Sequence, residues 1–288
     1  MFFLWIIGVS VLSCTKDKTD YEAEIDVIIP EYDQFEEVTT VRSGEYTVRV
    51  NALNGTLFTG YNEIRLQVTG GSGTASDATL LPIYTNPQGA QHTCPHRHAL
   101  AVAEGGQYFS GYAVFTETGN WVLHLALKAG GTARTAEIPV NVEAQTNQNL
   151  HHTAFVGNDG EAYLIALAAP QQPQVGENGL VAAIFNVHTD AEVLHEAYTE
   201  ADNYTLLLDP RMPEPAMCNH SSPNNKDLTQ RPDGFYQGLV NYTMTGNWTL
   251  NFILLDETRQ VIKGTVVPSD FTPGVAGTKS ELHIDILF

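Results

Sequence analysis

The chain has 288 residues, of which 14 are Lys or Arg and 33 are Asp or Glu, so its formal net charge is −19. A charge of this sign repels phosphate backbones and excludes nucleic acid as a partner. The length exceeds what one hydrophobic core usually serves, so we expect two folded domains. No apolar run approaches the roughly 20 residues that cross a bilayer, so any membrane contact should come through an anchor.

The N-terminal segment has the features of an export signal. Residues 2–12 are almost wholly apolar, but about 11 residues are too few to span a bilayer. The run ends in Val-Leu-Ser-Cys at residues 11–14, which resembles the lipobox of bacterial lipoproteins, although no Lys or Arg precedes the run. In that motif the cysteine is lipidated and becomes the first mature residue. We therefore predict a signal peptide over residues 1–13 and a membrane-anchoring lipid on Cys14.

The segment after the lipidation site has the composition of a solvated tether. Residues 14–40 are acidic and lack strong hydrophobic periodicity. Lys16 and Asp17 resemble the surface-export signals of Bacteroidetes-type lipoproteins. We therefore expect a lipid-anchored protein of the cell envelope, in the outer membrane rather than the inner one.

The remainder of the chain contains an internal repeat. Residues 105–121 can be aligned with residues 232–248, and both segments end in Thr-Gly-Asn-Trp. The two tryptophans, Trp121 and Trp248, each begin an apolar run after a tight turn, which is typical of core residues.

A second pair of motifs lies upstream in each copy. Cys94-Pro-His96 can be aligned with Cys218-Asn-His220 if the second copy carries a three-residue insertion. The two copies predict two homologous domains, residues 41–146 and 150–288, joined by a short polar linker.

Both copies have the pattern of antiparallel β-structure. Apolar residues alternate or form short β-rich runs, and turn signals such as Asn54-Gly55 separate the runs. The predicted strands cover residues 46–50, 63–68, 121–127 and 138–142 in the first copy, and 163–167, 181–187, 248–255 and 261–267 in the second. Short strands at this spacing are typical of immunoglobulin-like sandwiches. We therefore predict an all-β protein with two tandem immunoglobulin-like β-sandwiches, in which only residues 189–201 have helical spacing.

The sequence carries none of the common catalytic signatures. It has no Gly-x-Ser-x-Gly elbow, no His-Glu-x-x-His motif and no Walker-type phosphate loop. Its many carboxylates occur in no pattern typical of a general acid and base, so we interpret them as surface charge. We expect no enzyme activity.

Potential metal ligands are concentrated in the first copy. His92, Cys94, His96 and His98 occupy alternate positions, although the chain has only 10 His and 3 Cys. In an extended segment alternate side chains project to one side, and Pro95 disfavours a helix there. Up to four donors could therefore converge.

The corresponding stretch of the second copy offers sulfur donors. It contains Met212, Met217, Cys218 and His220, in a chain with only 4 Met. Thioether and thiolate ligands beside imidazole select copper, above all Cu(I), with zinc as the alternative. Tyr84 lies at about the place of Met212, so the first site would be richer in His and the second richer in Met.

Other interpretations of these residues remain open from the sequence. In an oxidising compartment Cys94 and Cys218 could pair as a disulfide, provided that their Cα atoms approach within about 7 Å. Cys, His and Met ligands also occur together in blue-copper electron-transfer sites. The histidines outside the repeated motif are interpreted as ordinary surface or strand residues: His151, His152, His188, His195 and His283.

The second copy resembles a known family. Residues 217–225, Met-Cys-Asn-His-Ser-Ser-Pro-Asn-Asn, and residues 233–250, with their Asp-Gly-Phe-Tyr start and Thr-Gly-Asn-Trp turn, are similar to YtkA-like and FixH-type envelope domains. The resemblance covers residues 204–255, and residues 80–127 more faintly. It implies an immunoglobulin-like fold and an association with copper delivery or with the assembly of copper-containing respiratory oxidases.

The resemblance also implies roles for single residues. Met212, Met217 and His220 fall on the family's Met and His positions, and Cys218 adds a donor. On this basis the protein is expected to bind copper and to pass it to an acceptor protein or an envelope complex. The rival hypothesis is a structural or accessory subunit that uses its domains as interaction modules and binds no metal.

Overall fold

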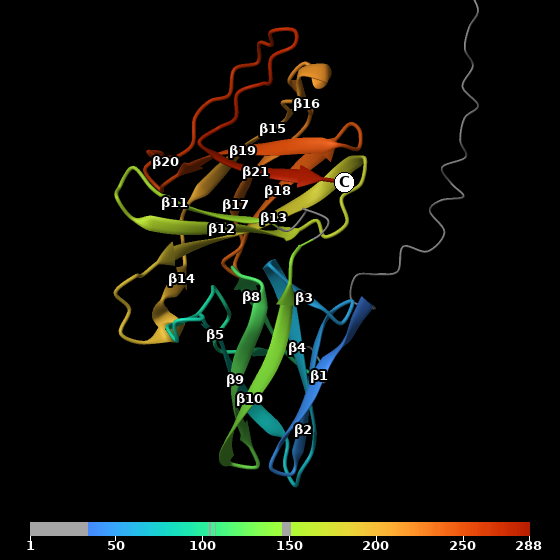
Figure 1. Ribbon diagram of the computed structural model, residues 1–288, viewed down its shortest axis with the longest axis vertical. Helices are drawn as coiled ribbons and strands as arrows, with labels where there is room; N and C mark the ends of the chain where they lie inside the picture. Colours follow the sequence, from blue (N-terminus) through green and yellow to red (C-terminus); the bar gives the residue numbers. More distant parts are fainter. Residues whose placement is uncertain (1–33, 104, 107, 146–150) are drawn as a thin grey trace, which may run out of the picture. The chain divides into compact units, whose positions relative to one another are not determined.

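The computed structural model of the protein describes residues 34–103, 105–106, 108–145 and 151–288 (Figure 1). Residues 35–288 form one compact unit. The predicted signal peptide, the lipidation site at Cys14 and most of the predicted tether lie outside the described residues. Within those residues, no helix has the length and apolar character needed to cross a membrane.

The first half of the compact unit, up to residue 145, consists of two five-stranded sheets. One sheet has the order β1-β2-β4-β8-β7 and the other the order β3-β10-β9-β5-β6. Neighbouring strands are antiparallel except for β3 and β10, which run parallel. The strands are β1 (Phe35–Ser43), β2 (Tyr46–Leu53), β3 (Leu57–Phe58), β4 (Gly60–Gly70), β5 (Ala75–Thr85), β6 (Gln91–His92), β7 (Ala101–Val102), β8 (Phe109–Phe115), β9 (Gly119–Ala129) and β10 (Thr132–Glu143).

The core of the first half is built from side chains that alternate along these strands. In β2 every second residue, beginning with Tyr46, is buried, as expected for a strand with one face on the core. Trp121 of β9 and Phe115 of β8 are fully buried, and their rings meet edge to face at 5.1 Å. The same period of two that predicted the strands therefore places their apolar face inward.

The second half, from residue 151, forms one sheet of 11 strands. The main path runs β11-β12-β13-β18-β17-β15-β19-β20, while β14, β16 and β21 pair with β13, β15 and β19. Because β17 pairs with both β18 and β15, hydrogen bonds connect strands whose counterparts in the first half lie in separate sheets. The elements are β11 (His152–Val156), β12 (Ala162–Ala169), β13 (Gly176–Val187), η2 (Leu194–Glu196), β14 (Tyr198–Glu200), β15 (Thr205–Met212), η3 (Pro215–Met217), β16 (His220–Ser221), β17 (Lys226–Gln230), β18 (Tyr236–Tyr242), β19 (Asn247–Leu255), β20 (Val261–Lys263) and β21 (Leu282–Leu287).

The predicted all-β class is confirmed. The described residues contain strands and the two single 3-10 turns η2 and η3, and the stretch with helical spacing at residues 189–201 contains only one of these turns before β14. The immunoglobulin-like assignment and the predicted domain boundaries stay predictions.

Two predicted boundaries differ from the structure. β1 begins at Phe35, so the last part of the predicted tether is a strand paired with β2. The strand predicted over residues 261–267 ends at Lys263. Gly264 follows with φ +104°, and a Cβ there would lie 2.2 Å from the carbonyl oxygen of Phe252, so the backbone turns away at this glycine.

The two halves share local hydrogen bonds as well as sequence. The indole Nε1 of Trp121 donates to the carbonyl of Glu117 at 3.0 Å, and that of Trp248 donates to the carbonyl of Met244 at 3.0 Å. Both tryptophans are fully buried, so this bond satisfies the only polar atom of each indole.

A second shared feature is an asparagine that closes the turn before a long strand. The Asn62 side chain accepts a hydrogen bond from the Phe58 amide and donates to the carbonyls of Phe58 and Gly60. Asn178 makes the corresponding bonds to Gln174 and Gly176. The same amide thus fixes the entry into β4 and into β13.

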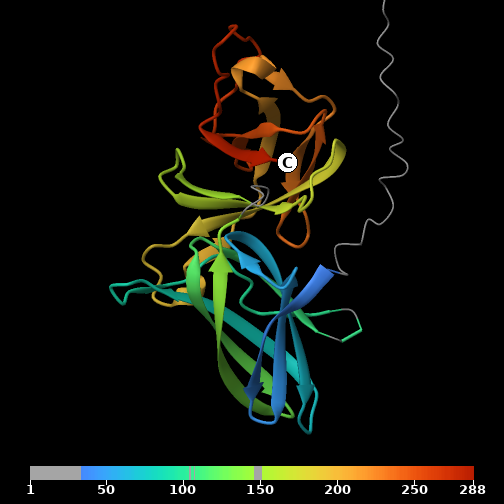
Figure 2. The same ribbon diagram turned by 45° about the vertical axis from the view of Figure 1, so that its right-hand side comes forward.

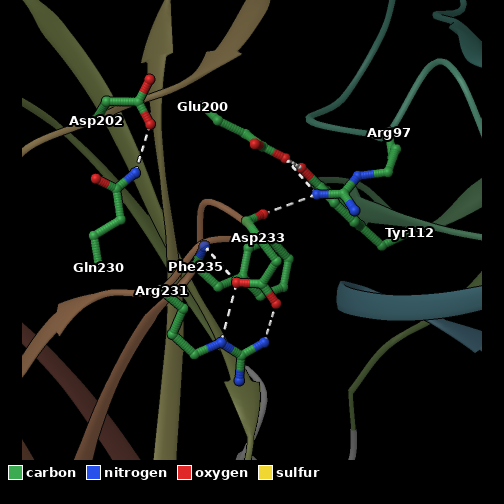
Figure 3. A network of polar contacts seen from close by, with 8 residues as sticks. All are labelled: Arg97, Tyr112, Glu200, Asp202, Gln230, Arg231, Asp233 and Phe235. Carbon is green, nitrogen blue, oxygen red and sulfur yellow. Dashed lines mark hydrogen bonds and ion pairs between the residues drawn. The ribbon is translucent and has the colours of Figure 1, made fainter. Parts of the chain in front are cut away.

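The two halves contact each other through a third group of buried apolar residues. It is formed by β8, β12, β13 and the loop before β18: Tyr112, Val114, Leu164, Ala166, Ala168, Ala183, Phe185 and Phe235. A polar network borders this group (Figure 3). Glu200 accepts hydrogen bonds from the hydroxyl of Tyr112 at 2.6 Å and from Nη2 of Arg97 at 3.0 Å. Burial, and then the bond to Glu200, raises the pKa of Tyr112, so its hydroxyl remains a donor.

Candidate functional site

The sulfur-rich motif of the second half lies on a hairpin between β15 and β16. Met212, the last residue of β15, pairs with His220, the first residue of β16. The connection contains the η3 turn, which begins at Pro215, a position where proline costs no hydrogen bond because the first amides of a helical turn have no partner within it. The strand pairing therefore brings a thioether and an imidazole together, although seven residues separate them in the chain.

Met212 of this pair is close-packed in apolar surroundings, whereas His220 is partly exposed. Met212 is only 2% exposed, and a Cβ on Gly246 would lie 2.9 Å from its methyl carbon. The ring of His220 lies 6.2 Å from the ring of Trp248, and its Nε2 lies 2.9 Å from Oγ1 of Thr243. Because Nε2 of the His220 imidazole bonds to Thr243, Nδ1 is the nitrogen that would bind a metal.

The two remaining donors of the motif follow one another on the turn. Met217 is partly buried and packs against the core of the second half. Cys218 is an exposed free thiol and adopts the left-handed conformation with φ 52°. The motif thus combines inward donors with one donor on the surface.

The turn is held by the long loop between β20 and β21. In both views the red loop lies beside the orange turn (Figure 1 and Figure 2). The Gly277 amide donates to the carbonyl of Pro213 at 2.7 Å, and Nδ2 of Asn219 donates to the carbonyl of Pro268 at 2.9 Å. These bonds fasten the chain just before and just after the turn that carries Met217 and Cys218.

The first half has an aromatic version of the same hairpin. Tyr84 of β5 pairs with His92 of β6, as Met212 pairs with His220. The His92 ring lies 5.1 Å from Tyr84 and 6.0 Å from Trp121, and its Nε2 lies 3.2 Å from a carboxylate oxygen of Glu117. The prediction that Tyr84 stands at the place of Met212 thus agrees with the strand pairing, but the pairing matches His92, and not His96, with His220.

Cys94 lies apart from the histidines around it. Its side chain is fully buried in the core of the first half, and burial raises the pKa of its thiol well above the usual range. The structure has Cys94 and Cys218 as free cysteines, the first buried and the second exposed. The alternate spacing therefore does not place all four predicted donors of the first half on one side.

His96 and His98 do lie together, and a third histidine joins them. Their rings are 6.0 Å apart, and the ring of His195 from η2 stacks on His98 at 4.5 Å with an interplanar angle of 14°. The pKa of His96 is lowered to about 4, chiefly by burial and in smaller part by His98 and His195, while the hydrogen bond to the carbonyl of Cys94 acts in the opposite direction. The sequence motif contained no sign of His195, because this residue comes from a part of the second half that lies outside the repeat.

The donors present limit what the hairpin could hold. Among the residues that the structure describes, no group of three or more His, Cys, Asp or Glu side chains could hold a metal ion. The second-half hairpin supplies only Cys218 and His220 of these types, so a metal there would need the thioethers of Met212 and Met217. Such a donor set fits a soft ion and not a hard one.

Comparisons with known proteins give no family. No protein-family model matches the chain, and no curated protein is significantly similar to it. Among solved structures, a conserved domain protein from Bacillus anthracis aligns with 90% of this chain and 93% of its own length, at 9% identity and a TM-score of 0.31. A DUF4785 family protein from Legionella pneumophila aligns with 76% of this chain and 54% of its own length, at 9% identity and a TM-score of 0.26. At these scores, neither alignment carries an argument about fold or function.

Proposed function

We propose that the protein is a lipid-anchored cell-envelope protein that binds Cu(I) on the β15–β16 hairpin and delivers or buffers it. The observation that carries the proposal is the pairing of Met212 with His220 across the hairpin, with Met217 and Cys218 on the turn between them. The lipid on Cys14 and the outer-membrane location rest on the sequence alone.

Ligand chemistry supports a monovalent soft ion. Thioether sulfur is uncharged and polarisable, and together with thiolate and imidazole it favours Cu(I) over harder ions such as Mg²⁺ or Ca²⁺. Met212 is buried beside the apolar core, where a hydrated divalent ion would lose much of its solvation. A thioether there costs nothing to bury when the metal is absent.

The position of the donors supports transfer and not permanent storage. Met212 and His220 are held by strand pairing, whereas Cys218 is exposed. An exposed thiol is the donor that a partner's own soft ligands can reach first. The acceptor would be a copper-binding protein or an envelope complex with a similar donor set.

The test is an anaerobic Cu(I) titration of the reduced full-length protein in detergent, in competition with a chromophoric Cu(I) chelator. We expect one tight equivalent for the hairpin, weakened at least about tenfold by Met212→Leu or by His220→Gln, since loss of one ligand or its support usually costs this much. The matched control is Met244→Leu, because Met244 is the remaining methionine of the described chain and is exposed.

The controls separate the two hypotheses. Unchanged Cu(I) affinity in both Met212→Leu and His220→Gln would overturn the hairpin site. Absence of any tight Cu(I) equivalent in the wild-type protein would favour the structural or accessory subunit instead.

A further inference from the structure

A small polar cavity lies where the two halves of the compact unit meet. Its volume is about 100 Å³, and its wall comes from the β2–β3 turn, the start of β4, the end of the first half and the loop between β12 and β13. This space is about that of three water molecules. It therefore admits one edge of a polar ligand, and the rest of the ligand would project into solvent.

Side-chain amides are the main polar groups of the wall. Asn54, Gln145, Gln171 and Gln172 line the cavity, together with Asn62, whose amide is already bonded within the turn before β4. An amide offers donors and an acceptor side by side, and a hydroxyl group both donates and accepts. A wall of this kind matches a ligand that carries several neighbouring hydroxyls.

One of these amides has a buried atom without a partner. The Oε1 of Gln171 is inaccessible to solvent, and no described residue donates a hydrogen bond to it. A buried acceptor without a partner lowers stability, and native structures usually supply a donor. A hydroxyl group in the cavity would be that donor.

The charge of the wall favours a neutral ligand. Among the described residues that line the cavity, Glu63 alone is charged, and its Oε1 lies 2.8 Å from Nε of Arg65. This ion pair offsets the charge of the carboxylate, whose oxygens can still accept from a hydroxyl. An anionic ligand would meet no cation in the wall and would be repelled by a chain of net charge −19.

Tyr61 gives the cavity a fixed aromatic wall. Its ring stacks on Tyr112 at 5.7 Å and meets Phe235 edge to face at 5.8 Å. Burial raises the pKa of Tyr61, so its hydroxyl keeps its proton. Aromatic carbons beside polar groups suit a sugar, because a sugar ring has apolar C–H groups as well as hydroxyls.

We propose that this cavity binds the hydroxyl-rich end of a neutral saccharide. The amides and the Glu63 carboxylate would bond to hydroxyls, and Tyr61 would contact the ring. Because Gln171 and Gln172 belong to the second half and Tyr61 and Glu63 to the first, the bound sugar would contact both halves. The site shares no residue with the β15–β16 hairpin, so it does not depend on the proposed function.

The test is saturation-transfer NMR of the full-length protein with the methyl glycosides of glucose, galactose and mannose, in a detergent without a sugar head group. We expect transfer to the ring protons of at least one glycoside, and about fivefold weaker affinity for it in Gln171→Leu, because one hydrogen bond is lost. The matched control is Gln174→Leu, since Gln174 is exposed on the same loop but does not line the cavity, and this variant should bind like the wild type. Glucuronate, an anionic probe, should bind more weakly than the neutral glycosides.

Thermal unfolding shows whether Gln171 serves a ligand or the fold. Gln171→Leu should leave the unfolding midpoint unchanged or raise it, because a buried atom without a partner adds nothing to stability. A fall of more than about 2 °C would overturn the proposal, since the Gln171 amide would then support the fold.

Three binding results would also overturn the proposal. They are no transfer to any glycoside with the wild type, which would leave water as the occupant, glucuronate binding as tight as that of the neutral glycosides, and equal affinity in Gln171→Leu and Gln174→Leu. Met212→Leu should bind the glycoside like the wild type, so a failure of the Cu(I) hairpin would leave this result unchanged.

Discussion

Tyr84 and Met212 occupy corresponding positions in the two halves of the molecule, yet the histidine beside each has a different partner. In the first half His92 lies among aromatic rings and contacts the carboxylate of Glu117. In the second half His220 lies against Trp248 and bonds to the hydroxyl of Thr243. A charged carboxylate binds an imidazole N–H more strongly than a neutral hydroxyl does, so the two rings are held differently.

The two hairpins share a backbone arrangement but differ in the side chains that could bind a metal. Both hairpins stand beside a buried tryptophan whose Nε1 donates to the carbonyl four residues earlier. The first half has Tyr84 where the second has Met212, so it lacks the thioether although its hairpin and its tryptophan hydrogen bond are the same. The repeat thus conserves a shape that presents two side chains across a hairpin, and the residue types decide whether a metal can bind there.

The largest expected effect comes from removing the buried tryptophan of either half. Trp121→Ala and Trp248→Ala should each lower the free energy of unfolding by about 3–5 kcal/mol, because each deletes a fully buried indole and leaves a cavity. Urea denaturation followed by circular dichroism measures the loss. A loss below about 1 kcal/mol in only one variant would show that the two tryptophans do not play equivalent roles.

Exchanging the paired residues should move the metal chemistry between the halves. Met212→Tyr should weaken Cu(I) binding about tenfold, or about 1.4 kcal/mol, whereas Tyr84→Met should create weak Cu(I) binding beside His92. Combining Tyr84→Met with Glu117→Gln should weaken that new binding, because the carboxylate that orients the His92 ring is gone. The chelator competition assay measures both, and a gain in Tyr84→Met that does not respond to Glu117→Gln would argue against this role of Glu117.

The contact between the halves should respond to loss of Glu200. Glu200→Ala removes the acceptor of both Tyr112 and Arg97, and we expect a loss of about 1 kcal/mol, since the carboxylate is partly exposed. Glu192→Ala, an exposed change in the neighbouring connection, is the matched control and should have little effect. Equal unfolding curves for Glu200→Ala and the wild type would mean that the apolar group alone maintains the contact.

The smallest effect concerns the strand that closes the second half. Burial raises the pKa of Asp285 on β21, but hydrogen bonds from Lys279 and Thr249 outweigh it, so the pKa lies below the ordinary 3.8. The resulting stability is present above pH 3.8 and is lost as the pH falls through the lower folded value. Asp285→Asn should therefore cost about 0.2–1 kcal/mol at pH 7, because the pair is half exposed. Unfolding curves of variant and wild type should converge in acid, and a constant difference down to pH 2 would contradict this assignment.

Strands with one strongly apolar face were predictable from the sequence. In β2 the buried residues alternate strictly, so the period of two was clear. β1 was missed because Glu36 and Glu37 face solvent and its one buried residue is the polar Ser43, which gives the strand little apolar signal. β1 is a strand because it pairs with β2, and its own residues give no pattern from which this pairing could be predicted.

The candidate sites were only partly predictable for a similar reason. The repeat matched Tyr84 with Met212, because they lie at nearly the same distance before the tryptophans of their copies. Spacing alone could not show that Cys94 enters the core while His96 and His98 turn toward η2. The contact with His195 joins residues almost 100 positions apart, and no local pattern encodes such a contact.

The bonds from Gly277 to Pro213 and from Asn219 to Pro268 couple the turn that carries Cys218 to a loop more than 40 residues further along the chain. Segments linked in this way open as one cooperative unit, so the turn cannot fray by itself. Amide hydrogen exchange of the turn and of the loop should then occur at a common rate. The rate of this joint opening would then limit how quickly the partly buried Met217 releases a bound ion, while Cys218 stays exposed throughout.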